Sequence, residues 1–155
     1  MKKIVTLLVL TLAFIGCKPK EQVASTALDQ KMERVLKGNW SITSVKYPGS
    51  DYIKVTSFDI ADSKCFVGST WKFVSNNNKG EMALNSCDNF SSQITWYINK
   101  DGKFVMKILN GTKARKLGEG YILSLNYQSE TSFQLIDQIN VGGKVTDVFY
   151  QFQKN

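Results

Sequence analysis

The strongest constraint on this chain is a two-residue alternation of apolar and polar side chains that begins after Gly38. Across residues 94–99, for example, Ile, Trp and Ile alternate with Thr, Tyr and Asn. Successive side chains of a β-strand point to opposite faces, so this period predicts strands with one buried face. Turn signals such as Asp101-Gly102, Asn110-Gly111 and Gly142-Gly143 separate the runs and supply the positive φ values of tight hairpins.

The pattern predicts about nine strands, at residues 39–47, 52–60, 69–75, 80–85, 92–99, 103–109, 115–127, 131–140 and 144–153. Short turns join most neighbours, which favours an antiparallel up-and-down meander. A meander of this length commonly closes, because closure removes the exposed edge strands. We therefore expect an all-β fold with an eight- to ten-stranded barrel, and a two-layer sandwich is the alternative.

One stretch before Gly38 instead has the period of a short helix. Its apolar residues share one helical face: Leu28, Met32, Val35 and Leu36. Ser25 or Thr26 is suited to cap the start, and Gly38 is suited to end the helix.

The N-terminal sixteen residues have the pattern of a secretory signal peptide. Lys2 and Lys3 precede a mostly apolar run at 4–15, which is shorter than the roughly 20 residues a transmembrane helix needs. The run ends in Phe14-Ile15-Gly16-Cys17, which resembles a lipobox, although Phe14 replaces the usual Leu. We expect a signal peptide at 1–16, lipidation (palmitate) of Cys17, a flexible tether at 17–26 and a domain at 27–155. Ordinary secretory cleavage is the alternative.

A lipidated Cys17 predicts a lipoprotein anchored in the bacterial cell envelope. As a separate expectation, the protein is a monomer. The outer membrane is favoured over the inner one, and the domain faces either the periplasm or the cell surface. Nucleic acid is not an expected partner. Loss of residues 1–16 lowers the net charge from +7 to +5. Lysines and arginines near 100–107 and 113–116 suit contact with anionic headgroups or polysaccharide, or else form an ordinary solvated surface.

Two cysteines remain once Cys17 is lipidated. An oxidising compartment favours their pairing, so we predict a Cys65–Cys87 disulfide, with two free buried thiols as the alternative.

The chain lacks the residues of the common catalytic centres. It has no histidine, which excludes Ser-His-Asp and Cys-His arrangements and histidine-based metal sites. We expect no metal, no cofactor and no enzymatic activity. Carboxylates are the remaining catalytic groups, and Asp137 and Asp147 are the pair that the last hairpin could bring face to face; surface carboxylates are the simpler interpretation.

Aromatic residues recur on the predicted strands, and a curled sheet would turn some of them inward. A barrel of this size is wide enough to hold one small ligand. Our candidates for the ligand cavity are Trp96, Phe104, Met106, Tyr121, Leu123, Leu125 and Tyr150. The alternative is that these side chains fill the core.

Gly38-Asn39-Trp40, after a short helix and at the start of the first strand, resembles the Gly-x-Trp signature of lipocalins. With residues 68–73, Cys87 and the 94–109 hairpin, the chain is similar over 36–109 to the lipocalin-like lipoproteins common in Bacteroidetes, which have a calycin-like barrel. The resemblance implies binding of a small hydrophobic ligand without catalysis, with Trp40 closing one barrel end. The family often places an arginine over this tryptophan, but the last two predicted strands contain none. A filled barrel that acts through its outer surface, as an envelope interaction or structural module, is the second hypothesis.

Overall fold

The computed structural model describes residues 23–87 and 89–155. One α-helix is followed by ten β-strands and two short 3₁₀ helices in this described part. Their bounds are α1 Val23–Leu36, β1 Gly38–Lys46, β2 Thr56–Ser57, β3 Ala61–Asp62, η1 Ser63–Phe66, β4 Thr70–Val74, β5 Lys79–Leu84, β6 Phe90–Ile98, β7 Phe104–Ile108, η2 Ala114–Lys116, β8 Tyr121–Ser129, β9 Ser132–Val141 and β10 Lys144–Lys154.

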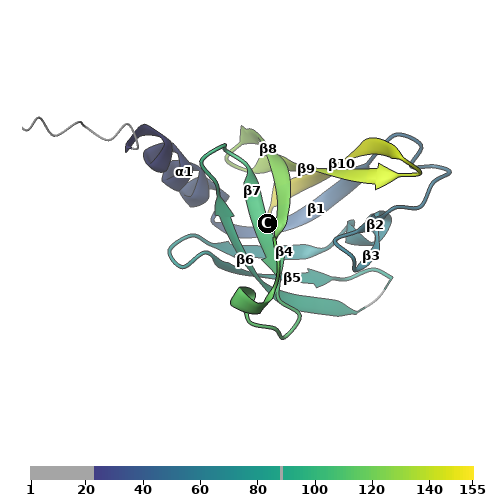
Figure 1. The fold of residues 1–155 in the computed structure, drawn as a ribbon, viewed down its shortest axis with the longest axis horizontal. Coiled ribbons are helices and arrows are strands. Elements are labelled where there is room, and N and C mark those ends of the chain that lie inside the picture. Colours follow the sequence, from purple (N-terminus) through teal and green to yellow (C-terminus); the bar gives the residue numbers. More distant parts are fainter. Residues whose placement is uncertain (1–22, 88) are drawn as a thin grey trace, which may run out of the picture.

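Eight of the strands form a closed antiparallel barrel in the order β1-β10-β9-β8-β7-β6-β5-β4. The prediction of an up-and-down barrel is confirmed, and the sandwich is excluded. The remaining two strands, β2 and β3, pair only with each other. Figure 1 shows this small hairpin and α1 on opposite sides of the barrel, so each barrel end has its own cover.

The register of the barrel explains the alternation in the sequence. Trp96 of β6 pairs with Met106 of β7, and Ile98 pairs with Phe104. All four side chains are buried in the core. Their neighbours along each strand point outward, because successive side chains alternate across the sheet.

Close strand packing requires a glycine at Gly80 of β5. A Cβ added there would collide with the backbone carbonyl oxygen of Lys72 on β4 and with the side chain of Ile94 on β6. The residue is buried, so the neighbouring strands leave no room for such a shift.

Two of the predicted strands are wrong in part. The segment 52–60 is not one strand: only Thr56–Ser57 is extended there, and the chain turns back to pair with Ala61–Asp62. Phe58 and Asp59 make this turn with φ of 53° and 52°. The predicted strand at 115–127 begins only at Tyr121, because 114–116 forms the 3₁₀ helix η2.

The helix α1 begins at Val23, so Ser25 and Thr26 lie inside it rather than capping it. The last four residues of the predicted tether at 17–26 are therefore helical. The helix ends before Gly38, whose φ of +139° favours glycine. The predicted signal peptide and Cys17 lie outside the described residues. Within the described part, no helix has the length and apolar character needed to cross a membrane.

Candidate functional site

One end of the barrel is closed by a segment that we call the plug, residues 55–66, which contains β2, β3 and η1. Two of its serines, Ser57 and Ser63, are buried, and Ser57 bonds to the barrel. The Ser57 hydroxyl is hydrogen-bonded to the hydroxyls of Ser63 and of Tyr150 on β10. Ser63 also donates to the carbonyl oxygen of Val55 at 2.7 Å. All three hydroxyls are thus satisfied in the interior, which fixes the plug against β10.

The apolar side of the plug adds two phenylalanines to the barrel interior. The ring of Phe58 lies 5.2 Å from that of Tyr150 and 5.1 Å from that of Tyr121, between centroids. It also meets Phe66 edge to face at 5.3 Å. Aromatic pairs at these separations stabilise beyond the area that they bury. The plug is therefore part of the core at this end.

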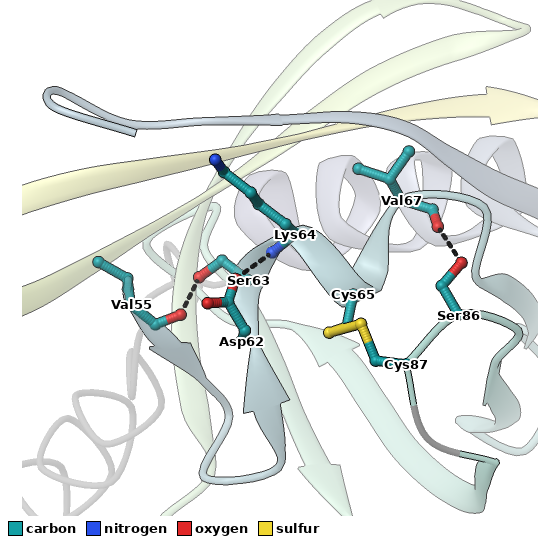
Figure 2. The surroundings of a disulfide bond; sticks show 8 residues. All are labelled: Val55, Asp62, Ser63, Lys64, Cys65, Val67, Ser86 and Cys87. Atoms are coloured by element: carbon teal, nitrogen blue, oxygen red, sulfur yellow. Dashed lines mark hydrogen bonds between the residues drawn. A yellow bond between two sulfur atoms is a disulfide. The ribbon is translucent and has the colours of Figure 1, made fainter. Parts of the chain in front are cut away.

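A disulfide ties the plug to the loop between β5 and β6 (Figure 2). Cys65 and Cys87 are bonded, as predicted. Two hydrogen bonds lie close to it: Ser86 Oγ donates to the Val67 carbonyl at 3.3 Å, and Asn85 Nδ2 donates to the Gly68 carbonyl at 2.8 Å. The covalent bond and these contacts attach the segment after the plug to the barrel wall.

Aromatic rings also occupy the rest of the interior. Phe133 and Phe152 stack with centroids 4.5 Å apart, and Trp96 stacks on Phe104 at 5.6 Å. Phe73 contacts members of both stacks, at 5.1 Å to Trp96 and 6.3 Å to Phe152. All five side chains are almost completely buried. They form a continuous ring-to-ring network across the barrel.

The seven predicted cavity residues all belong to this interior. Five of them are buried in the core: Trp96, Phe104, Met106, Leu123 and Tyr150. Tyr121 and Leu125 are partly buried and pack against the same core. The structure thus brings the predicted set together, and their neighbours are other core side chains. Contact of these residues with a ligand stays a prediction.

Trp40 lies at the opposite end, beneath α1. Its indole Nε1 donates to the carbonyl oxygen of Leu36 at 2.8 Å, and its ring meets Phe133 at 4.6 Å. Lys154 Nζ lies 5.4 Å from the centroid of the Trp40 ring, within cation–π range. The cation expected over this tryptophan is thus a lysine. Because the expected cation was an arginine, the contact of Lys154 was not predicted, although Lys154 directly follows the alternating run at 144–153.

Glu33 fixes α1 to this end of the barrel. Its Oε1 accepts from the backbone N–H of Ile98 at 3.0 Å and from Asn78 Nδ2 at 3.2 Å. These donors belong to the end of β6 and to the turn before β5. The helix and the plug therefore cover opposite ends of one filled barrel.

Three ionisable groups lie near the plugged end. Tyr121 donates to Asp59 Oδ2 at 3.2 Å, and burial together with this carboxylate raises the pKa of Tyr121 to about 12. Burial also raises the pKa of Asp137, which pairs across the barrel wall with the inward Val148. Asp147 pairs instead with Gln138 and accepts a hydrogen bond from its amide, so the last hairpin does not bring Asp137 and Asp147 face to face.

No cluster of three or more potential metal-ligating side chains occurs among the described residues.

A groove of about 950 Å³ lies on the outside of the barrel, and we call it the outer groove. Outward residues of β4, β5 and β6 form its floor, and the loop after β7 forms a wall. The lining residues are Asn39, Thr70, Trp71, Lys72, Glu81, Met82, Ala83, Ser91, Ser92, Gln93, Leu109, Gly111, Thr112, Lys113 and Asn155. Only Lys113 lies in a segment predicted to suit contact with anionic headgroups or polysaccharide, and the other lining residues were not predicted to bind a ligand.

The family comparison agrees with this architecture. The profile of the lipocalin-like domain family matches residues 36–135, which includes Trp40, the disulfide and the strands from β1 into β9. The chain belongs to the lipocalin-like domain family. No curated protein and no solved structure matches it.

The match places the whole plug inside the lipocalin-like domain and extends beyond the 36–109 region on which the resemblance was recognised. The binding role and the membrane anchor expected for such a protein are not carried by the match itself.

Proposed function

We propose that this lipocalin-like protein is a lipid-anchored, non-enzymatic interaction module of the bacterial cell envelope, and that it binds through its outer surface. One observation carries the proposal: a ring-to-ring aromatic network occupies the barrel, and α1 and the plug cover its two ends. In this view the interior is a structural core, and recognition takes place in the outer groove.

The filled interior argues against a carrier that holds its ligand in the barrel. Protein interiors are packed as densely as organic crystals, so a ligand can enter only by displacing side chains. Moving the plug would also break the buried hydrogen bond between the hydroxyls of Ser57 and Tyr150. An unsatisfied buried polar group costs about 1–3 kcal/mol, and the ligand's own buried area would have to offset that loss.

The anchor rests on the N-terminal sequence. Lys2 and Lys3, the apolar run at 4–15 and Cys17 have the order of a lipoprotein signal, and the helix α1 starts six residues after Cys17. Six extended residues span at most about 20 Å, so the domain would stay close to the membrane. Mass spectrometry of protein from its own host tests this directly: Cys17 should carry the lipid, and a Cys17→Ala variant should remain unmodified and leave the membrane fraction.

The carrier remains the second candidate, because Tyr121 and Asp137 at the plugged end are only partly buried and could meet the head of an amphipathic ligand. A panel of lipids and hydrophobic dyes separates the two candidates through tryptophan fluorescence. Trp96 lies in the interior, so a ligand inside the barrel should quench it saturably.

We expect no saturable quenching from any member of the panel. A Phe104→Trp variant narrows the interior further, so it should weaken the binding of any ligand inside the barrel. Saturable quenching of the parent protein that is weaker in this variant would refute the filled-barrel proposal. An exposed Tyr97→Trp variant serves as the matched control, because its ring lies outside the barrel.

A further inference from the structure

The floor of the outer groove is a grid of polar side chains set by the strand register. Lys72 of β4 pairs with Glu81 of β5, and Glu81 pairs with Gln93 of β6. One step along the strands, Thr70, Ala83 and Ser91 form the next row. Every member of the grid except Ala83 is exposed. Neighbouring side chains on one sheet face lie about 5 Å apart, so the grid offers closely spaced donors and acceptors.

The wall of the groove is held in place by backbone hydrogen bonds. The Leu109 N–H donates to the Gln93 carbonyl at 2.9 Å, and the Asn110 N–H donates to Ser92 Oγ at 2.8 Å. The Thr112 N–H closes the turn onto the Leu109 carbonyl at 2.6 Å. The loop is thus attached to the floor strand β6 before any ligand arrives, which lowers the ordering cost of binding.

The chemistry of the lining favours one ligand class. Six of its exposed side chains are uncharged hydrogen-bonding groups: Asn39, Thr70, Ser91, Gln93, Thr112 and Asn155. Lys72 and Lys113 add donors, and Glu81 adds an acceptor. Amides, hydroxyls and a carboxylate at sheet spacing match the alternating donors and acceptors of sugar hydroxyls. On the proposed outer-surface function, we propose that the outer groove binds a short oligosaccharide.

The competing occupant is a peptide, and the lining argues against it. Peptide recognition rests on large apolar or aromatic side chains seated in desolvated pockets. The groove offers Ala83 and Leu109 as partly exposed apolar groups, whereas Trp71 and Met82 are buried beneath the floor. Its volume of about 950 Å³ is near the upper end of small-molecule sites, which leaves room for several sugar units.

The test uses the full chain in detergent and a panel of probes: maltohexaose, chitohexaose and an oligouronate. Binding is followed by titration and by backbone amide shifts in isotope-labelled protein. We expect saturable binding of at least one probe, with the shifted amides confined to 70–72, 81–83, 91–93 and 109–113. The double variant Glu81→Ala/Gln93→Ala should weaken that binding about tenfold or more.

Gln138→Ala is the matched control, because Gln138 is an exposed, outward glutamine on β9, away from the groove. It should bind the probe like the parent protein. Failure of all three glycans to bind would overturn the oligosaccharide assignment, as would binding that the double variant leaves unchanged. A library peptide that shifts the groove amides instead would also overturn it, while leaving the outer-surface function intact. Failure of that function is detected separately, by the hydrophobic ligand panel.

Discussion

Removal of the Cys65–Cys87 disulfide should lower the free energy of unfolding by an amount that follows from the length of the loop that the bond closes. The two cysteines are separated by 22 positions in the sequence. In the chain-entropy model, a crosslink over such a loop restricts the unfolded chain and stabilises the fold by about 3 kcal/mol. We therefore expect Cys65→Ala/Cys87→Ala to lower the free energy of unfolding by about that amount.

Urea unfolding followed by tryptophan fluorescence measures the effect. With a typical urea dependence, a loss of about 3 kcal/mol lowers the midpoint on the order of 1–3 M. The same titration of the parent protein with a reductant is the control, since reduction opens the loop but keeps both sulfur atoms. Agreement between the reduced protein and the double variant would assign the loss to the crosslink rather than to the volume removed at the buried Cys65.

The chain-entropy model also predicts that reduction leaves the native state unchanged. If the bond acts on the unfolded chain, the plug should stay in place after reduction, because the Ser57–Tyr150 hydrogen bond and the Phe58–Tyr150 contact still hold it. Amides that exchange by local opening, such as that of Ser63, should then keep their exchange rates. A loss below about 1 kcal/mol would refute the entropic reasoning, and so would selective deprotection of the plug, which would instead make the disulfide a native-state clamp.

Three further perturbations test the core. Gly80→Ala should lower the free energy of unfolding in urea by about 2–3 kcal/mol, because its Cβ would collide with a backbone carbonyl oxygen of β4. Gly118→Ala is the control and should be nearly neutral, because its Cβ would meet open space. Equal effects of the two substitutions would contradict the packing argument. Tyr150→Phe should cost about 1 kcal/mol, because Ser57 loses a buried hydroxyl partner; an unchanged midpoint would show that the bond adds nothing net. Burial raises the pKa of Asp137 from 3.8, so the folded state holds its proton more tightly and this residue lowers stability as the pH rises through the interval above 3.8. Asp137→Asn should therefore be more stable than the parent protein at pH 7, with a difference that vanishes below pH 3.8; a difference independent of pH would contradict this assignment.

The parts of the fold that were predicted correctly are those where side-chain alternation and a glycine turn coincide. The hairpin from β6 to β7 has both, and its predicted bounds of 92–99 and 103–109 differ from the observed ones by at most two residues. The plug was mispredicted as a strand for the opposite reason. Its turn is made by Phe58 and Asp59 at positive φ, a conformation that is uncommon outside glycine and that a bulky residue such as Phe rarely adopts. The burial of Phe58 among three aromatic rings holds this turn, and such tertiary contacts leave no local trace in the sequence.

The candidate site likewise has a part that the sequence predicts and a part that it does not. The inward set around Trp96 and Phe104 could be predicted, because burial repeats with the strand period. The outer groove could not be predicted. Lys72, Glu81 and Gln93 come from three strands, and only the register aligns them. The wall depends on where the loop after β7 folds, which is decided by hydrogen bonds from Leu109 and Asn110 to β6.

The strands β5 and β6 contribute both to the closed end of the barrel and to the outer groove. The loop between them carries Cys87, whose disulfide to Cys65 holds the plug. On the outside, the same strands carry most of the groove floor, and Ala83 precedes Cys87 by only four positions. The contacts that keep the barrel mouth closed therefore also brace the surface that we assign to recognition. A closed interior and a preformed outer groove are then consequences of one set of restraints, so a filled barrel is compatible with a binding function.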